Sequence, residues 1–187
     1  PEFPDTSNAS YACEGMFEHC LNLYDASGLT IPFRTLPTYC YQRMFYGCTN
    51  LRNSPNLYGA TGQQMTSHCY ASMFEGCMRL RDAPALPSTH LAGDCYSQMF
   101  AGCISLSEAP TLPATTLASN CYQGMFAGCY SIGLRRMKND AITPGLPSLP
   151  ANPTLASGCF DGMFGGISVY SKGRSTGLAG DTKDMTT

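Results

Sequence analysis

The sequence lacks tryptophan, carries little charge and contains no long apolar run. Charged residues make up 13% of its 187 residues, against about 25% in typical globular domains. The net charge is −2, and no basic cluster is larger than the group Arg135, Arg136 and Lys138. A nucleic-acid partner is therefore not expected, because binding phosphates needs a basic surface. Membrane insertion is not expected either, because no apolar run approaches the roughly 20 residues that span a bilayer.

The residue types that usually carry chemistry are also sparse or badly spaced. The three histidines, His19, His68 and His90, follow no ligand spacing, and the closest cysteines are seven residues apart. This excludes the close pairs of zinc sites and of redox C-x-x-C motifs. His68 stands beside Cys69, but neighbours on a helix point in different directions. No phosphate-binding glycine motif occurs, so we expect neither an enzyme nor a cofactor.

What the sequence does contain is a repeat. Four segments read Cys-Tyr-x-x-Met-Phe-x-Gly-Cys, at residues 40–48, 69–77, 95–103 and 121–129, and the first cysteines are 29, 26 and 26 residues apart. Degenerate copies flank them: the first has Ala12 and Cys13 in place of Cys-Tyr, and the last has Ile167 in place of the second cysteine. About six units with atypical ends predict a solenoid with caps.

The second half of the unit repeats as well. An apolar residue follows the second cysteine by three positions and a proline follows it by seven, as Leu51 and Pro55 do. Cysteine, tyrosine, methionine, phenylalanine and cysteine at positions 0, 1, 4, 5 and 8 predict a short helix with one buried face. The proline-containing stretch predicts a short extended strand. Stacked coils would then share a continuous core of Met, Phe, Leu and Cys. The recurring glycines are expected to be left-handed helix caps: Gly47, Gly76, Gly102 and Gly128.

The repeat resembles the BspA-like leucine-rich-repeat proteins of bacterial surfaces over roughly residues 11–167. Residues 45–51 and 100–106 fit the Phe-x-x-Cys-x-x-Leu motif of that family, and Met99 to Ala118 matches a variant of gut Bacteroidetes surface proteins. The resemblance implies an α/β repeat fold, a leucine-rich-repeat solenoid of about six coils, each with one short helix and one short strand. It also implies adhesion to matrix proteins or to other cells.

The expected organisation has three parts. An N-terminal extension covers residues 1–10, the solenoid covers residues 11–170 with a loop insertion at 134–153, and a tail or linker covers residues 171–187. A start at Pro1 is compatible with removal of a signal peptide, which fits an extracellular or cell-surface location.

Three interpretations of the cysteines remain open. They could be free core residues, since free Cys is among the most buried residue types. They could bridge within a unit, although positions eight apart on a helix lie too far apart. They could also join the second cysteine of one coil to the first of the next, a scheme that uses every position except the two missing at the ends. Its pairs are Cys20–Cys40, Cys48–Cys69, Cys77–Cys95, Cys103–Cys121 and Cys129–Cys159.

Positions that vary between units are free to carry specificity. The most variable positions flank the leucine after the second cysteine, and stacking would place them in rows on one face. The expected ligand-binding residues are Tyr24, Asn50, Arg52, Arg79, Arg81, Asp82 and Glu108. The leading hypothesis is an extracellular adhesion or recognition module that binds a protein or glycan. The alternative is a structural subunit of a surface filament, sheath or phage appendage, with self-association through its terminal coils. An accessory domain of an enzyme is a third interpretation.

Overall fold

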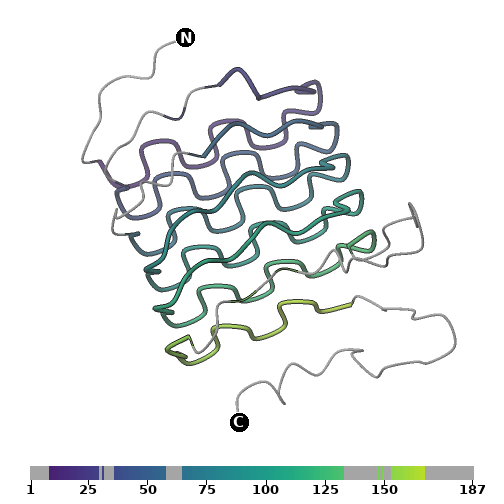
Figure 1. Ribbon diagram of the computed structural model, residues 1–187. Helices are drawn as coiled ribbons and strands as arrows, with labels where there is room; N and C mark the ends of the chain where they lie inside the picture. The colour runs from purple at the N-terminus through teal and green to yellow at the C-terminus, as the bar shows by residue number, and fades with distance from the viewer. Residues whose placement is uncertain are drawn as a thin grey trace, which may run out of the picture.

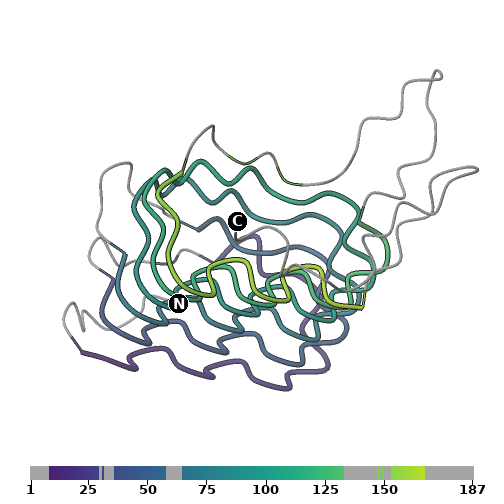
Figure 2. The same ribbon diagram turned by 90° about the horizontal axis from the view of Figure 1, so that it is seen from below.

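The chain forms a solenoid of six stacked coils. The computed structural model describes residues 9–29, 31, 36–57, 65–132, 147, 149 and 153–166. The coils follow one another along a single axis, with the N-terminal coil at the top of Figure 1 and the C-terminal coil at the bottom. Each coil has an undulating run on one side and a smoother return run on the other (Figure 2). Six long runs of turn residues between positions 10 and 166 confirm the expected number of coils.

Several predicted segments lie outside the described residues. They are residues 1–8 of the N-terminal extension, the end of the solenoid at 167–170, and the tail at 171–187. The loop insertion at 134–153 also lies outside them, apart from the isolated positions 147, 149 and 153.

The cysteine-rich unit forms a ribbon of consecutive turns, and the described residues contain no helix. The ribbons cover residues 10–19, 38–47, 67–76, 93–102, 119–128 and 157–166. The predicted short helix is therefore wrong. We call these six segments the turn ribbons, and we number the coils by them.

Backbone N–H groups along a turn ribbon alternate between two kinds of acceptor. In the second coil, the N–H of Tyr41 donates to the carbonyl of Cys69 in the next coil at 2.9 Å. The N–H of Met44 donates to the Tyr41 carbonyl three residues earlier, at 3.2 Å. The alternation holds throughout, and five backbone hydrogen bonds join each ribbon to the next. In the second turn ribbon, every N–H from Tyr39 to Gly47 therefore has a partner without any helical bond, as burial demands.

Every fourth residue of a turn ribbon has a positive φ, which a right-handed helix does not allow. In the second coil these residues are Tyr39, Arg43 and Gly47, with φ of 61°, 56° and 68°. Over nine residues, buried positions 0, 1, 4, 5 and 8 fit a period of four as well as one of 3.6, which explains the wrong prediction. The left-handed glycines are confirmed, although they cap no helix. Their φ values lie between 68° and 75° at Gly47, Gly76, Gly102 and Gly128.

Two aromatic columns run along the axis inside the coils. Phe45 stacks on Phe74 with ring centroids 5.4 Å apart, and Tyr41 stacks on Tyr70 at 5.5 Å. The first column continues through every coil, and the second ends on Phe160. Methionines and leucines of the repeat pack beside them, so the predicted continuous core is confirmed. Each ring contacts only the adjacent coils, and stability therefore arises at the interfaces between neighbours.

The proline-containing stretch forms the return run, but it contains no continuous strand within the described residues. The pairing between coils is reduced to isolated parallel bridges. They join Asp25 to Asn53, Asp82 to Glu108, and Thr116 to both His90 and Thr154. The prolines explain this result, because they have no N–H to donate to a ladder.

All eleven cysteines are free thiols, and ten of them are buried. No disulfide joins Cys40 to Cys48 within a unit. The predicted bridges between coils are absent as well: Cys20–Cys40, Cys48–Cys69, Cys77–Cys95, Cys103–Cys121 and Cys129–Cys159. The cysteines form two separate columns, in which Cys69 lies near Cys40 and Cys77 near Cys48. The first and second cysteines of a unit lie at opposite ends of its turn ribbon, so the two columns stay apart. Ten of the cysteines are core residues, and Cys20 is exposed.

Candidate functional site

Two rows, exposed except at their half-buried last members Ser107 and Glu108, lie where each turn ribbon passes into the return run. One row consists of Tyr24, Arg52, Arg81 and Ser107, and the other of Asp25, Asn53, Asp82 and Glu108. Together with Arg79 we call them the exit surface. The N–H of Arg52 donates to the Tyr24 carbonyl at 2.9 Å, and Asp82 bridges to Glu108. The stacking therefore brings five of the seven predicted binding residues into rows, with Arg79 and Asn50 two residues earlier in their coils.

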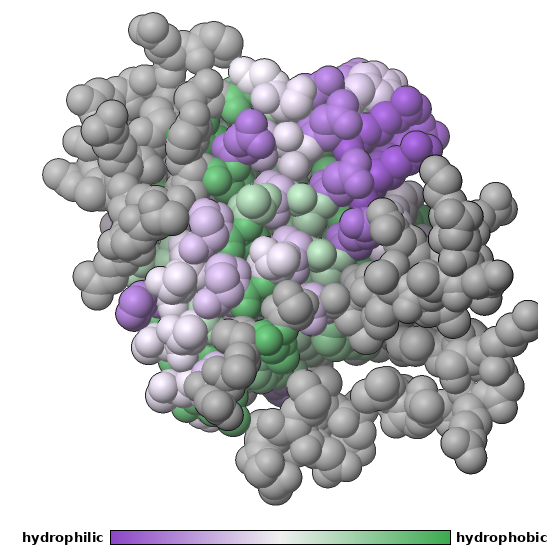
Figure 3. All heavy atoms as spheres, in the orientation of Figure 1, coloured by the Kyte–Doolittle hydropathy of each residue, from purple (hydrophilic) through white to green (hydrophobic). Residues whose placement is uncertain are grey.

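The arginines of the exit surface are available to a partner. Arg52, Arg79 and Arg81 are exposed, and none of them forms an ion pair within the described residues. Tyr24, in the same row, is 51% exposed. In the view of Figure 3, the most hydrophilic residues gather at the upper right, over the N-terminal coils. An unpaired guanidinium can bind carboxylate or sulfate groups through two parallel hydrogen bonds.

Two polar residues near these arginines are already engaged. The side-chain amide of Asn50 donates to the Leu21 carbonyl at 2.8 Å, which ties its coil to the first. Asp25 accepts hydrogen bonds from the N–H of Ser27 at 2.8 Å and from the Asn53 amide at 3.1 Å. These bonds from Ser27 and Asn53 lower the pKa of Asp25. Asp25, at the N-terminal end of the second row, therefore stays ionised. Asn50 has a structural role, because its amide ties two coils together.

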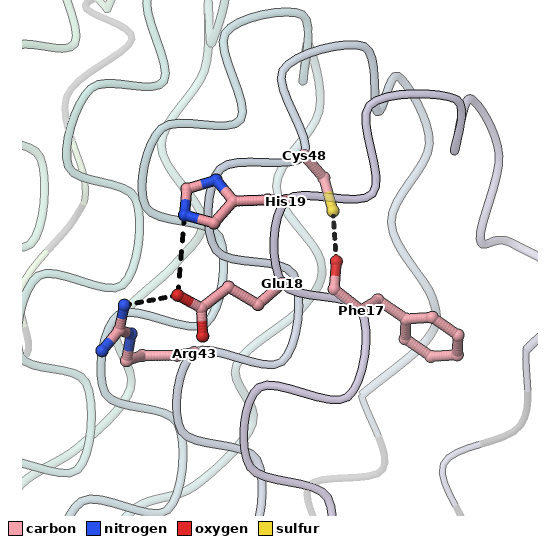
Figure 4. Close-up of polar contacts among 5 residues, drawn as sticks. All are labelled: Phe17, Glu18, His19, Arg43 and Cys48. Carbon is pink, nitrogen blue, oxygen red and sulfur yellow. Dashed lines mark hydrogen bonds and ion pairs between the residues drawn. The ribbon is translucent and has the colours of Figure 1, made fainter.

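A second polar cluster, which the sequence did not reveal, lies on the turn ribbons of the first two coils. The guanidinium of Arg43 pairs with Glu18 at 2.5 Å and lies 4.4 Å above the ring of Tyr46. Glu18 also faces the Nε2 of His19 at 3.6 Å (Figure 4). Glu18, Arg43 and Tyr46 occupy variable positions of the repeat and His19 replaces its glycine, so only the stacking places them together. Because these charges satisfy one another, the cluster has less to offer a partner than the exit surface.

A serine, a histidine and an aspartate also meet on the ribbon face. The Ser67 hydroxyl lies 3.1 Å from Nδ1 of His68, whose Nε2 lies 3.8 Å from Asp94. The same hydroxyl donates to the Gly93 carbonyl at 3.0 Å, so its proton is not directed at the imidazole. His68 stacks on Tyr39 with ring centroids 4.6 Å apart. The group orders the surface but does not match the geometry of a nucleophile activated by a base.

The thiols are poor nucleophiles for a different reason. Burial raises the pKa of Cys48 to about 11 and that of Cys129 to about 12. In the second column, thiols donate to the phenylalanine carbonyl of the preceding coil, as from Cys48 to Phe17 at 2.9 Å (Figure 4). A thiol that donates a hydrogen bond must keep its proton, whereas reactivity requires the thiolate. Burial raises the pKa of Cys69 as well, which keeps its thiol protonated beside His68.

The described residues contain neither a metal-binding cluster nor a membrane-spanning helix. No three His, Cys, Asp or Glu side chains converge there in an arrangement that could hold a metal ion. No helix there is long and apolar enough to span a bilayer.

Comparison with known proteins finds one similar solved structure. It is a leucine-rich repeat protein from Bacteroides ovatus ATCC 8483, with 18% identity and a TM-score of 0.40. The match covers 83% of this chain and 40% of that chain, so this chain spans less than half of that protein's length. No protein-family model matches the sequence, and no curated protein matches it either. A function for this chain therefore has to be argued from its own residues.

Proposed function

We propose that this solenoid is a non-enzymatic recognition module of the cell surface, which binds an extracellular protein or glycan through its exit surface. The observation that carries the proposal is the row of Tyr24, Arg52 and Arg81, which is exposed and contains two arginines that form no ion pair with any described residue. Tyrosine and arginine are the residue types that most often dominate binding energy at interfaces. Stacked coils hold such side chains in register, as they do the core phenylalanines, whose ring centroids lie 5.4 to 5.7 Å apart from coil to coil.

The contrast between the framework and the exit surface supports the proposal. The buried columns repeat the same residues from coil to coil, while the exit surface changes from Tyr24 to Arg52 to Arg81 along one row. A rigid framework with variable exposed positions is typical of repeat proteins that bind partners. The cell-surface location rests on the resemblance of the repeat to bacterial surface proteins. The cysteines do not bear on it, because buried protonated thiols resist oxidation in any compartment.

The test is a binding screen with a matched pair of variants. The folded chain is applied to an array of sulfated, sialylated and neutral glycans and to immobilised extracellular matrix proteins. A variant with Arg52→Ala, Arg79→Ala and Arg81→Ala is compared with Arg43→Ala, which removes an arginine from the turn ribbon. We expect the triple variant to lose at least about tenfold in affinity, since a single anchor contributes above about 1 kcal/mol.

Arg43→Ala should bind within about twofold of the wild type, because its charge is already paired with Glu18. Full binding by the triple variant, or the absence of binding to every probe, would contradict the proposal. Melting curves of both variants check that the fold is intact.

A further inference from the structure

The backbone hydrogen bonds between neighbouring turn ribbons all point the same way. From the first coil to the last, the N–H groups that point out of a turn ribbon donate to carbonyls of the following coil. The N–H of Tyr70 donates to the Cys95 carbonyl, and the N–H of Tyr96 donates to the Cys121 carbonyl, both at 3.0 Å. An ordinary parallel strand directs both N–H and C=O groups to each neighbour. The two ends of this solenoid must therefore differ in hydrogen-bonding character.

The N-terminal end presents acceptors. Inner coils receive these hydrogen bonds at alternate carbonyls, which in the second coil are those of residues 38, 40, 42, 44 and 46. The equivalent carbonyls of the first coil accept no hydrogen bond within the described part of the chain. They belong to Ser10, Ala12, Glu14, Met16 and Glu18.

The C-terminal end presents donors. In the fifth coil, the N–H groups of Tyr122 and Phe126 donate to the sixth coil at 3.0 and 2.8 Å. The equivalent N–H groups of the sixth coil find no acceptor among the described residues. They belong to Gly158, Phe160, Phe164 and Gly166. One end of the ribbon stack thus offers five carbonyls and the other offers four N–H groups at matching positions along the ribbon.

We propose that a second copy of this chain stacks with its N-terminal end on the C-terminal end of the first, so that the protein assembles head to tail. Carbonyls cannot pair with carbonyls, so two N-terminal ends do not match, and neither do two C-terminal ends. Only the unlike ends are complementary, which makes the contact heterologous and open-ended. The inference is independent of the proposed binding function, which uses another surface.

Apolar side chains at the two ends lack the neighbours that cover their counterparts inside the solenoid, and such stacking would supply those neighbours. Leu36 and Leu117 are 3% and 7% exposed, but Leu155, at the same repeat position in the sixth coil, is 53% exposed. Met16 of the first coil is 43% exposed, whereas the repeat methionine of every other coil is buried. Phe17 and Phe164 each stack on a single ring within the described residues. A stacked copy would cover these apolar groups with the same residue types that cover them inside the solenoid.

The second cysteine column shows the same incompleteness. The thiols of Cys48, Cys77 and Cys103 donate to the phenylalanine carbonyl of the preceding coil at 2.9, 3.2 and 3.1 Å. Cys20 begins this column and is exposed, since no coil precedes it in the described residues. In a head-to-tail contact, the carbonyl at the matching position belongs to Phe164 of the preceding copy. Assembly should therefore bury the Cys20 thiol.

The experiment uses the full chain and three lysine variants. Met16→Lys places a charge on the N-terminal end, Leu155→Lys places one on the C-terminal end, and Met78→Lys changes an equally exposed methionine in the third coil, at 46%. Sedimentation velocity between about 1 and 100 µM covers the affinities expected of a modest interface. We expect the wild type and Met78→Lys to form elongated oligomers that grow with concentration, and both end variants to stay monomeric.

Mixing the variants distinguishes head-to-tail contact from other modes. Met16→Lys keeps a competent C-terminal end and Leu155→Lys keeps a competent N-terminal end, so an equal mixture should form dimers and no larger species. The reactivity of Cys20 toward a thiol reagent should fall at least about fivefold as the wild type assembles, because buried thiols are protected. A wild type that remains monomeric throughout, equal loss of assembly in Met78→Lys, or a mixture without dimers would overturn the proposal.

Discussion

Glycine substitutions should reveal whether the cysteine-rich unit is a turn ribbon, because a ribbon and a helix predict opposite signs. Gln98 is exposed and has a φ of 53°, while Gly102 has a φ of 72°. A residue with a side chain in the left-handed region costs about 1–2 kcal/mol, and glycine costs about 0.5–1 kcal/mol through the entropy of the unfolded chain. Gln98→Gly should therefore stabilise the fold by about 0.5–1 kcal/mol.

Gly102→Ala should have the opposite effect. An added Cβ would lie 3.6 Å from the backbone of Gly76, an ordinary contact distance, so the cost is conformational and about 1–2 kcal/mol. In a helix, by contrast, Gln98→Gly would destabilise by about 1 kcal/mol. Gln98→Ala is the control, since it removes the side chain but keeps the Cβ.

Calorimetry and urea unfolding followed by tyrosine fluorescence suit a chain without tryptophan. For 150–250 residues, each 1 kcal/mol shifts the melting temperature by about 2–4 °C. A lower melting temperature for Gln98→Gly, together with an unchanged one for Gly102→Ala, would refute the ribbon.

Three further predictions concern the core. Phe100→Ala should lower the free energy of unfolding in urea by about 3–5 kcal/mol, because its buried ring stacks on both neighbours. Phe164→Ala, which removes a ring with one ring contact, should lower it clearly less. Equal losses would argue against the stacked column. At neutral pH and low protein concentration one thiol, Cys20, should react rapidly and the other ten only on unfolding; eleven fast thiols would contradict their burial. Burial raises the pKa of Cys121 to about 11 and that of Cys129 to about 12, above the ordinary 9.0. Because the native state then holds protons that the unfolded state releases, stability should be unaffected by these thiols below about pH 9 and fall above it, by about 1 kcal/mol per thiol and pH unit up to the folded pKa. Urea unfolding between pH 7 and pH 11 measures this, and a flat profile would count against it.

The exit surface could be predicted because it depends only on coil register. The distance in sequence from the second cysteine is the same in each coil, so Arg52 and Arg81 were bound to fall in one row once the coils stacked. The role of Asn50 could not be predicted, since its amide bond to the Leu21 carbonyl depends on where the preceding coil places that carbonyl.

The cluster of Glu18, His19, Arg43 and Tyr46 escaped prediction for a related reason. Within the repeat, Glu18, Arg43 and Tyr46 occupy unspecified positions and His19 stands in place of the glycine, and a helix would have spread these positions around its surface. A signal was present in the last unit, where Gly158, Gly162 and Gly166 recur every four residues. All three have positive φ. Glycines that recur every four residues indicate left-handed backbone conformations at regular intervals, which a right-handed helix does not contain.

The sequence by itself determined the number of coils, the buried columns and the rows of exposed residues. Those features follow from repetition, because identical units that cannot bury their apolar face alone must stack in register. Only the tertiary structure decided the backbone of each coil and the state of the cysteines. A nine-residue stripe does not separate a period of 3.6 from one of four, and the choice falls to the hydrogen bonds between coils. Those bonds keep the two cysteine columns apart and give the solenoid unlike ends.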